Sequence, residues 1–147
     1  ENLPAISALA ACLPACLAER EAQMQRQGAL RDDLEAQLAA RFCEVQIFAD
    51  AGPRVANTSC LALPGLSAET ALIGLDLAGV RASSGAACSS GKVRPSRVLR
   101  AMGIAPERAA EAIRLSFGWA SAASDVEAIL TAFARIGARR HQLQGIE

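Results

Sequence analysis

The sequence predicts an α+β fold with a short, mainly antiparallel sheet packed with helices. Apolar residues recur at helical spacing over long segments at both ends of the chain, and a few short alternating segments lie between them. Strands and helices do not alternate strictly, which favours α+β over α/β architecture. With 147 residues, 52% of them hydrophobic, the chain can bury a continuous core, and we expect a single domain over residues 1–147.

The first forty residues are predicted to be helical. Leucines recur every four positions over residues 9–17 and again over residues 30–38. Pro14 lies inside this pattern, and a proline within a helix removes one backbone hydrogen bond and clashes with the preceding turn. We therefore expect either a kink at Pro14 or two helices, with Gly28 as a second weak point.

Shorter elements fill the rest of the chain. Strands are expected where apolar residues alternate with polar ones or form a short run, at residues 44–49, 59–63, 80–82 and 113–117. Helices are expected between caps or prolines and glycine stops, at residues 68–77 after Ser67, from Pro95 to Gly103, from Pro106 to Glu111, and after a Ser124–Glu127 capping box. A turn at residues 50–53 separates the first two strands.

The charge balance excludes some classes of partner. Fifteen basic and fifteen acidic residues cancel, so the net positive charge that attracts nucleic acid or anionic lipid is absent. We expect no nucleic-acid partner and no membrane partner. Charges or prolines interrupt the apolar stretches, and the first residues lack a signal pattern, which indicates a cytoplasmic protein. The five cysteines have no regular spacing and are expected to be reduced.

A run of nine small residues in the second half of the chain is the candidate for chemistry. It consists of Ser83, Ser84, Gly85, Ala86, Ala87, Cys88, Ser89, Ser90 and Gly91. No large side chain anchors this loop to a core, so we expect it to be mobile. Cys88 could then approach a substrate and withdraw, and the positive charge of Lys92, Arg94 and Arg97 would raise its thiolate fraction. An isolated cysteine is more often a small residue that fills a tight turn.

The residues around Cys88 favour the reactive interpretation. From Ser83 through Lys92 to Gly103 the sequence closely resembles the active-site loop of group I cysteine desulfurases, the NifS/IscS-like family of class V aminotransferases. The resemblance covers nearly the whole chain. It extends to the Glu-Asn segment at residues 1–6, the Leu-Arg-Asp run at residues 30–34, the Asn57-Thr58 pair before a strand, and the Ile113-Arg114-Leu115-Ser116-Phe117-Gly118 strand.

The resemblance implies a fold, a reaction and site residues. The chain would be the C-terminal small domain of a fold-type I pyridoxal-phosphate enzyme. Cys88 would take sulfur from L-cysteine, keep it as a persulfide and release L-alanine. Arg114 would hold the substrate carboxylate, for which a guanidinium fork is well suited, and Asn57 would also bind substrate. For Arg114 the alternative is a surface charge on a strand edge.

Two positions depart from the family pattern. Ala86 stands where many relatives have serine, which removes a hydroxyl and keeps the residue small. Trp119 follows Gly118 where relatives often have arginine, so contacts beyond the anchor strand are expected to differ. Neither departure affects the predicted nucleophile.

The resemblance also shows what this chain lacks. Pyridoxal phosphate needs a lysine, and the single lysine, Lys92, lies on the loop rather than in a segment like the family's cofactor site. We therefore expect the large cofactor-binding domain to be absent from this chain, no cofactor to be held by it, and the chain alone to be inactive. A fragment, a separately expressed domain and a split gene product would all fit.

The implied partners follow from the family. They are L-cysteine, the large domain, a sulfur-acceptor or scaffold protein such as one of iron–sulfur cluster assembly, and a second subunit in a homodimer. Two alternatives stay open. One is a non-catalytic sulfur-carrier or interaction module that uses Cys88 without a cofactor, and the other is a different class V aminotransferase-like enzyme.

The other thiols carry no predicted function. Cys12 and Cys16 lie one helical turn apart, but no CxxC pair supplies further ligands, and the sole histidine, His141, lies near the other end of the chain. We predict no metal site. Beside two arginines, His141 is interpreted as a solvated cation at a helix end.

Overall fold

The computed structural model describes residues 1–84 and 96–144, and of residues 139–144 it describes the backbone alone. The elements in chain order are α1 (Leu3–Arg41), β1 (Gln46–Ile47), β2 (Thr58–Ala62), α2 (Ala68–Leu77), β3 (Ser83–Ser84), α3 (Arg97–Ala101), α4 (Pro106–Glu111), β4 (Ile113–Ser116) and α5 (Ala123–Gln144).

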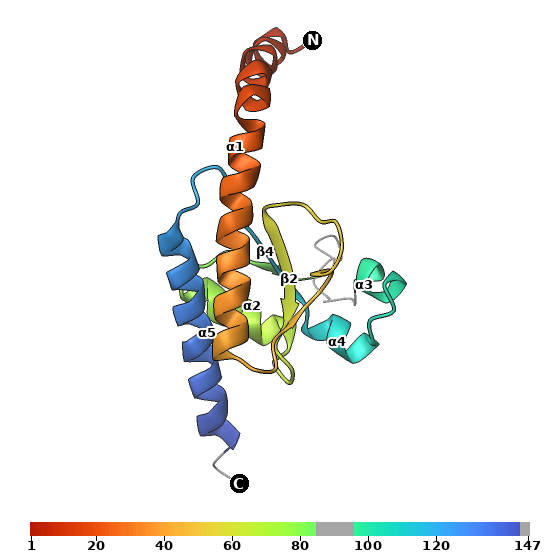
Figure 1. Cartoon of the computed structure of the whole chain (residues 1–147), viewed down its shortest axis with the longest axis vertical. Coiled ribbons are helices and arrows are strands. Elements are labelled where there is room, and N and C mark those ends of the chain that lie inside the picture. The colour runs from red at the N-terminus through yellow and green to blue at the C-terminus, as the bar shows by residue number, and fades with distance from the viewer. Residues whose placement is uncertain (85–95, 145–147) are drawn as a thin grey trace.

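The four described strands form one antiparallel sheet in the order β1-β2-β4-β3. Helices α1, α2 and α5 cover one face, and the short helices α3 and α4 lie on the other side of the sheet (Figure 1). The predicted α+β class, with a short antiparallel sheet packed with helices, is confirmed.

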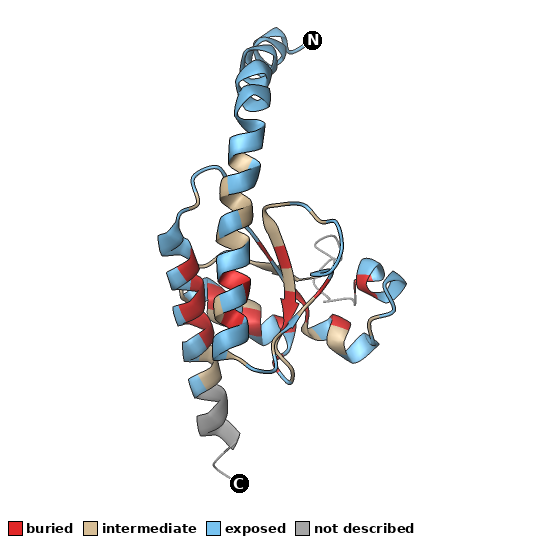
Figure 2. Ribbon diagram, viewed as in Figure 1, coloured by how far each residue is buried: buried red, intermediate tan, exposed pale blue. Residues whose placement is uncertain are grey.

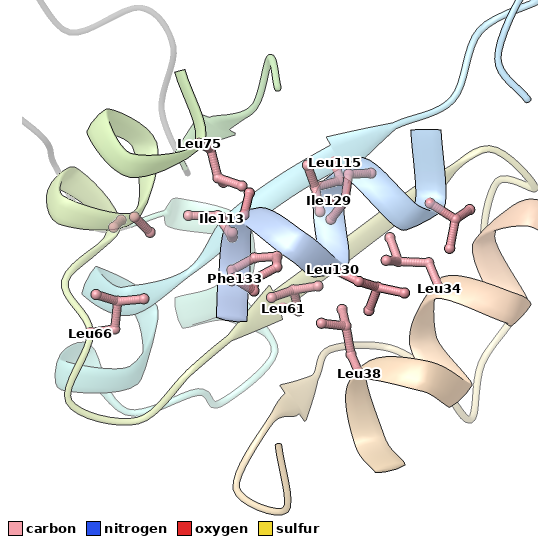
Figure 3. Close-up of a cluster of buried hydrophobic side chains, with 14 of the residues drawn as sticks. Leu34, Leu38, Leu61, Leu66, Leu75, Ile113, Leu115, Ile129, Leu130 and Phe133 are labelled. Carbon is pink, nitrogen blue, oxygen red and sulfur yellow. The ribbon is translucent and has the colours of Figure 1, made fainter. Parts of the chain in front are cut away.

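The main core lies between the sheet and the three longer helices. Successive strand residues point to opposite faces, so Leu61 of β2 and Ile113 and Leu115 of β4 all point toward these helices. Figure 3 shows them among Leu34 and Leu38 of α1 and apolar residues of α2 and α5. A smaller cluster lies on the opposite face, and its buried members are Phe48, Ala62, Leu99, Ala109 and Ala112.

Helix α1 is one continuous helix with Pro14 inside it, so the two-helix alternative is wrong. Asn2 caps its start, because its side-chain oxygen accepts a hydrogen bond of 3.2 Å from the backbone nitrogen of Ala5. Only the C-terminal part of α1 packs on the sheet. Residues 1–22 are exposed and project from the body of the molecule (Figure 2).

One stretch of α1 bears on the expectation that there is no membrane partner. By length and composition α1 could cross a membrane, since an 18-residue window has a mean hydropathy of 1.3, and that window is fully exposed. A helix that packs against other parts of a protein can have the same length and composition. The finding is weak evidence, and the absence of a membrane partner stays a prediction.

Local signals located α2 and α4 correctly. Ser67 caps α2 by accepting a hydrogen bond of 3.2 Å from the backbone nitrogen of Thr70. Gly79 follows the helix with a φ of 77°, a left-handed conformation that glycine adopts without strain. Pro106 opens α4 as predicted, because a proline lacks a backbone N–H that the first turn would not use.

Several boundaries differ from the predictions. The first strand is reduced to Gln46–Ile47, and the strand expected at residues 80–82 lies instead at Ser83–Ser84, where the chain pairs with β4. Two residues assigned to the mobile loop are therefore strand residues. Ser96, rather than Pro95, caps α3 by accepting a hydrogen bond of 3.4 Å from the backbone nitrogen of Leu99.

The start of α5 also differs. The helix begins at Ala123, so Ser124 lies in its first turn and cannot be the cap. Instead, the carboxylate of Asp125 accepts a hydrogen bond of 3.0 Å from the backbone nitrogen of Ala122. This is the return half of a capping box, made two residues earlier than the sequence pattern suggested.

Candidate active site

The site is the face of the sheet that points away from α1, α2 and α5. Burial along β4 alternates, so that Arg114 and Ser116 are exposed while their neighbours are buried. Arg114 lies opposite Cys60 of β2 and Ser83 of β3. Ser116 lies opposite Thr58, and the two hydroxyl oxygens are 3.0 Å apart. Residues directly opposite in antiparallel strands share a face, so these five side chains belong to one surface.

Arg114 is the only charged residue in the described strands. Its guanidinium is exposed and forms no hydrogen bond or ion pair with any residue that the structure describes. The strand residues on the same face are all uncharged side chains, namely Gln46, Thr58, Cys60, Ala62, Ser83 and Ser116. An unpaired guanidinium with neutral neighbours is suited to bind a carboxylate through two parallel hydrogen bonds.

Cys60 lies between Arg114 and the smaller apolar cluster. It is half-buried, and it packs with Ile104 against the buried residues of that cluster. Burial raises the pKa of the Cys60 thiol above its usual value, and the charge of Arg114 offsets part of that increase. Cys60 is therefore a neutral thiol at neutral pH. By contrast, Cys12, Cys16 and Cys43 are exposed.

Sequence reasoning did not assign Cys60 to the site. The alternation within residues 59–63 and 113–117 placed Cys60 and Arg114 on strands. It did not show that these strands are neighbours or which residues are opposite. Only the register brings the thiol and the guanidinium together.

Asn57 connects the start of β2 to the end of β4. Its side-chain nitrogen donates a hydrogen bond of 3.0 Å to the backbone carbonyl oxygen of Phe117. The backbone carbonyl oxygen of Asn57 accepts a hydrogen bond of 2.8 Å from the backbone nitrogen of Phe117. The structure thus gives Asn57 a role in holding the strand that carries Arg114. A direct contact with substrate stays a prediction.

The turn after β4 is held by a residue from α1. The guanidinium of Arg26 donates to the carbonyl oxygens of Gly118, at 3.2 Å, of Trp119, at 2.6 Å, and of Ser121. The hydroxyl of Ser121 in turn accepts a hydrogen bond of 2.9 Å from the Gly118 nitrogen. The Trp119 side chain is left 82% exposed. No local pattern indicated this role for Arg26, because its partners lie more than ninety positions away.

The predicted nucleophile lies outside the described residues. Ser83 and Ser84 of the loop are in β3, whereas Gly85, Cys88, Ser89, Ser90 and Gly91 are not described, and neither the reactivity of Cys88 nor the expected mobility is tested. Ser83 is opposite Arg114, and Cys88 follows Ser84 by four residues. Four residues of extended chain span at most about 14 Å.

The described residues thus form an α+β domain with an unpaired arginine on the open face of its sheet. No family model matches the chain. The chain is 34% identical over 143 residues to a cysteine desulfurase of Gluconacetobacter diazotrophicus, covering 97% of this chain and 36% of that protein. It is 35% identical over 139 residues to a cysteine desulfurase of Bradyrhizobium diazoefficiens, covering 95% and 35%.

Solved structures agree with the sequence comparison. A NifS-like protein from Rickettsia africae matches with a TM-score of 0.67 and 30% identity, over 78% of this chain and 29% of that one. A second NifS-like protein has a TM-score of 0.80 over 94% of this chain and 34% of that one. At 22% identity it shows the fold alone. In sequence and fold this chain is similar to the C-terminal part of NifS/IscS-like cysteine desulfurases. It spans about a third of the length of these relatives.

Proposed function

We propose that the complete protein to which this chain belongs is a cysteine desulfurase, and that this chain supplies its nucleophile and its substrate-carboxylate anchor. The observation that carries the proposal is Arg114, an exposed and unpaired guanidinium, one strand away from the segment that leads to Cys88. The similarity to proteins named cysteine desulfurase supports the choice of L-cysteine as substrate.

The roles of the chain's own residues follow from their chemistry. The guanidinium of Arg114 would hold the carboxylate of L-cysteine and fix the direction of its side chain. The Cys88 thiolate would attack the substrate sulfur, forming an S–S bond while the substrate's carbon–sulfur bond breaks. The electron pair left on the carbon is protonated, which gives L-alanine. Cys88 keeps the sulfur as a persulfide for a sulfur-acceptor protein.

The cofactor of this reaction would be held elsewhere in the complete protein. Pyridoxal phosphate supplies the electron sink for cleavage of the carbon–sulfur bond when it is bound. The described residues do not fit it, because attachment needs a lysine and the single lysine, Lys92, lies outside them. We therefore assign the cofactor to the large domain. We also propose that the complete protein is a homodimer and that it is located in the cytoplasm.

The test uses the complete protein, supplied with pyridoxal phosphate and L-cysteine, and follows alanine release together with persulfide on Cys88 by mass spectrometry. We expect Cys88→Ser to abolish both. We expect Arg114→Lys, which keeps the charge and loses the fork, to raise the KM for cysteine about tenfold or more. Cys43→Ser is the matched control, because that thiol is exposed and away from the open face.

Two outcomes would contradict the proposal. Alanine release that persists in Cys88→Ser would remove the assigned nucleophile. A protein that accepts sulfur on Cys88 from a persulfide donor, but releases no alanine from cysteine, would instead be a sulfur carrier.

A further inference from the structure

A residue of β2 lies directly opposite Arg114 in the sheet. In an antiparallel pair, directly opposite side chains lie about 5 Å apart, and opposite charges at such positions attract each other. A carboxylate at this position would pair with Arg114 within the protein. The residue there is Cys60, whose thiol is neutral, so the guanidinium has no partner across the strands among the described residues.

The other neighbours of Arg114 are consistent with this arrangement. On the β3 side the opposite residue is Ser83, and the next residue of β4 on the same face is Ser116, whose hydroxyl is engaged with Thr58. The described acidic residue closest in sequence, Glu111, is engaged elsewhere, because it pairs with Arg108 and accepts a hydrogen bond from the Gly65 nitrogen.

The environment of Cys60 keeps its side chain in place and uncharged. One side of the thiol packs on the apolar cluster that includes Leu99, Ala109 and Ala112. This packing restricts the side chain and, by desolvation, disfavours the thiolate. A negative charge next to Arg114 is therefore avoided even though the residue is ionisable.

We propose that Cys60 is a specificity-determining residue, which keeps the Arg114 guanidinium free of a protein counter-ion so that it can bind the carboxylate of the substrate. The inference rests on the proposed function for the identity of that substrate. It adds a residue that acts through Arg114 and has no part in the transfer of sulfur.

The test compares two variants of nearly equal shape in the complete protein, Cys60→Asp and Cys60→Asn. The aspartate is expected to pair with Arg114 and to raise the KM for cysteine about five- to tenfold, with kcat within about twofold of the unchanged protein. The asparagine, which has the same size and no charge, is expected to give a KM several-fold lower than that of the aspartate variant. Cys60→Ser provides a conservative variant, and gel filtration with circular dichroism checks that each protein is folded.

A second readout does not depend on catalysis. Phenylglyoxal modifies arginine side chains, and peptide mass mapping gives the rate at Arg114. We expect slower modification of Arg114 in Cys60→Asp than in Cys60→Asn, with unchanged rates at the exposed Arg97 and Arg100.

The two readouts separate the inference from the proposed function. If the complete protein releases no alanine, the proposed function fails and the modification rates still decide whether Cys60 governs the pairing of Arg114. Equal KM values for the aspartate and asparagine variants in an active enzyme would overturn the inference. Equal rates of Arg114 modification in the two variants would overturn it in either case.

Discussion

Ser59 is a polar residue in the middle of an apolar surface. It is fully buried on the side of β2 that faces α1, α2 and α5, and its hydroxyl oxygen has no hydrogen-bond partner among the described residues. The neighbouring residue on that side of β2 is Leu61, and Leu115 is directly opposite on β4. A buried hydroxyl without a partner loses its hydrogen bonds to water and gains none in the protein.

Ser59→Ala is therefore expected to raise the free energy of unfolding by about 1 kcal/mol. Urea unfolding measures the change. The matched control is Ser96→Ala, because Ser96 is also a buried serine but caps α3. Removal of the Ser96 hydroxyl is expected to lower the free energy of unfolding by about 1 kcal/mol. A loss of stability in Ser59→Ala would show that its hydroxyl has a partner in solution.

At the scale of elements, polar contacts fasten the long loop between β1 and β2 to α1. The guanidinium of Arg54 donates two hydrogen bonds, of 2.7 and 2.5 Å, to the carboxylate of Glu35. This pairing raises the pKa of Arg54, and the hydrogen bond to Glu35 is the largest cause. Glu35 is only 7% exposed, so its charge depends on this partner.

Arg54→Met is expected to lower the free energy of unfolding by about 2 to 3 kcal/mol, because it leaves a buried carboxylate without a partner. Thermal unfolding checks the loss of stability, and hydrogen exchange is expected to show faster opening over residues 48–57. Asp32→Asn removes the more exposed pair with Arg31 and is expected to change stability by less than about 0.5 kcal/mol. Similar effects of the two variants would contradict this account.

The close contact between α2 and α5 requires a glycine at position 74. A Cβ added at Gly74 would lie 2.6 Å from Cγ1 and 2.7 Å from Cδ1 of Ile136. Gly74→Ala is therefore expected to lower the free energy of unfolding by about 1 kcal/mol, since the strain exceeds the gain in helix propensity. In an Ile136→Ala background the same substitution is expected to be neutral or stabilising. A double-mutant cycle measures this coupling, and additive effects would contradict it.

At the scale of the whole molecule, the proposed function is divided between this chain, which would bind the substrate, and the large domain, which would hold the cofactor. In the proposed function Arg114 is the carboxylate anchor and Cys88 the nucleophile, but neither fixes a cofactor ring relative to the substrate. In addition, residues 1–22 project from the body with their apolar side chains exposed (Figure 2).

The isolated chain is consequently expected to retain no stoichiometric pyridoxal phosphate through gel filtration and to release no alanine from cysteine. Any weak adduct with added cofactor is expected to disappear in Lys92→Ala, because Lys92 is the single lysine. Absorbance of the eluted protein and alanine analysis give the two readouts. Retained cofactor with Cys88-dependent alanine release would show that the chain contains a complete site.

Much of the architecture was predictable because its causes are local. The bounds of α2 follow from a capping serine and a glycine stop, and those of β4 from the alternation of Ile113, Arg114 and Leu115. The same is true of the overall class, since the periods of the apolar residues distinguish helices from strands. The resemblance that led to Arg114 and Cys88 likewise resides in contiguous segments.

The sequence by itself determined which segments are helical or extended and which residue types could bind a carboxylate or attack sulfur. Only the tertiary structure decided which of them meet. In the structure the third strand is Ser83–Ser84, and Cys60 and Ser83 lie on either side of Arg114. Arg26 of α1 binds the turn after β4. The physical reason is that caps and periodicity act within a few residues of chain. Strand register and side-chain bonds to distant carbonyl groups depend on how all the packed elements fit together.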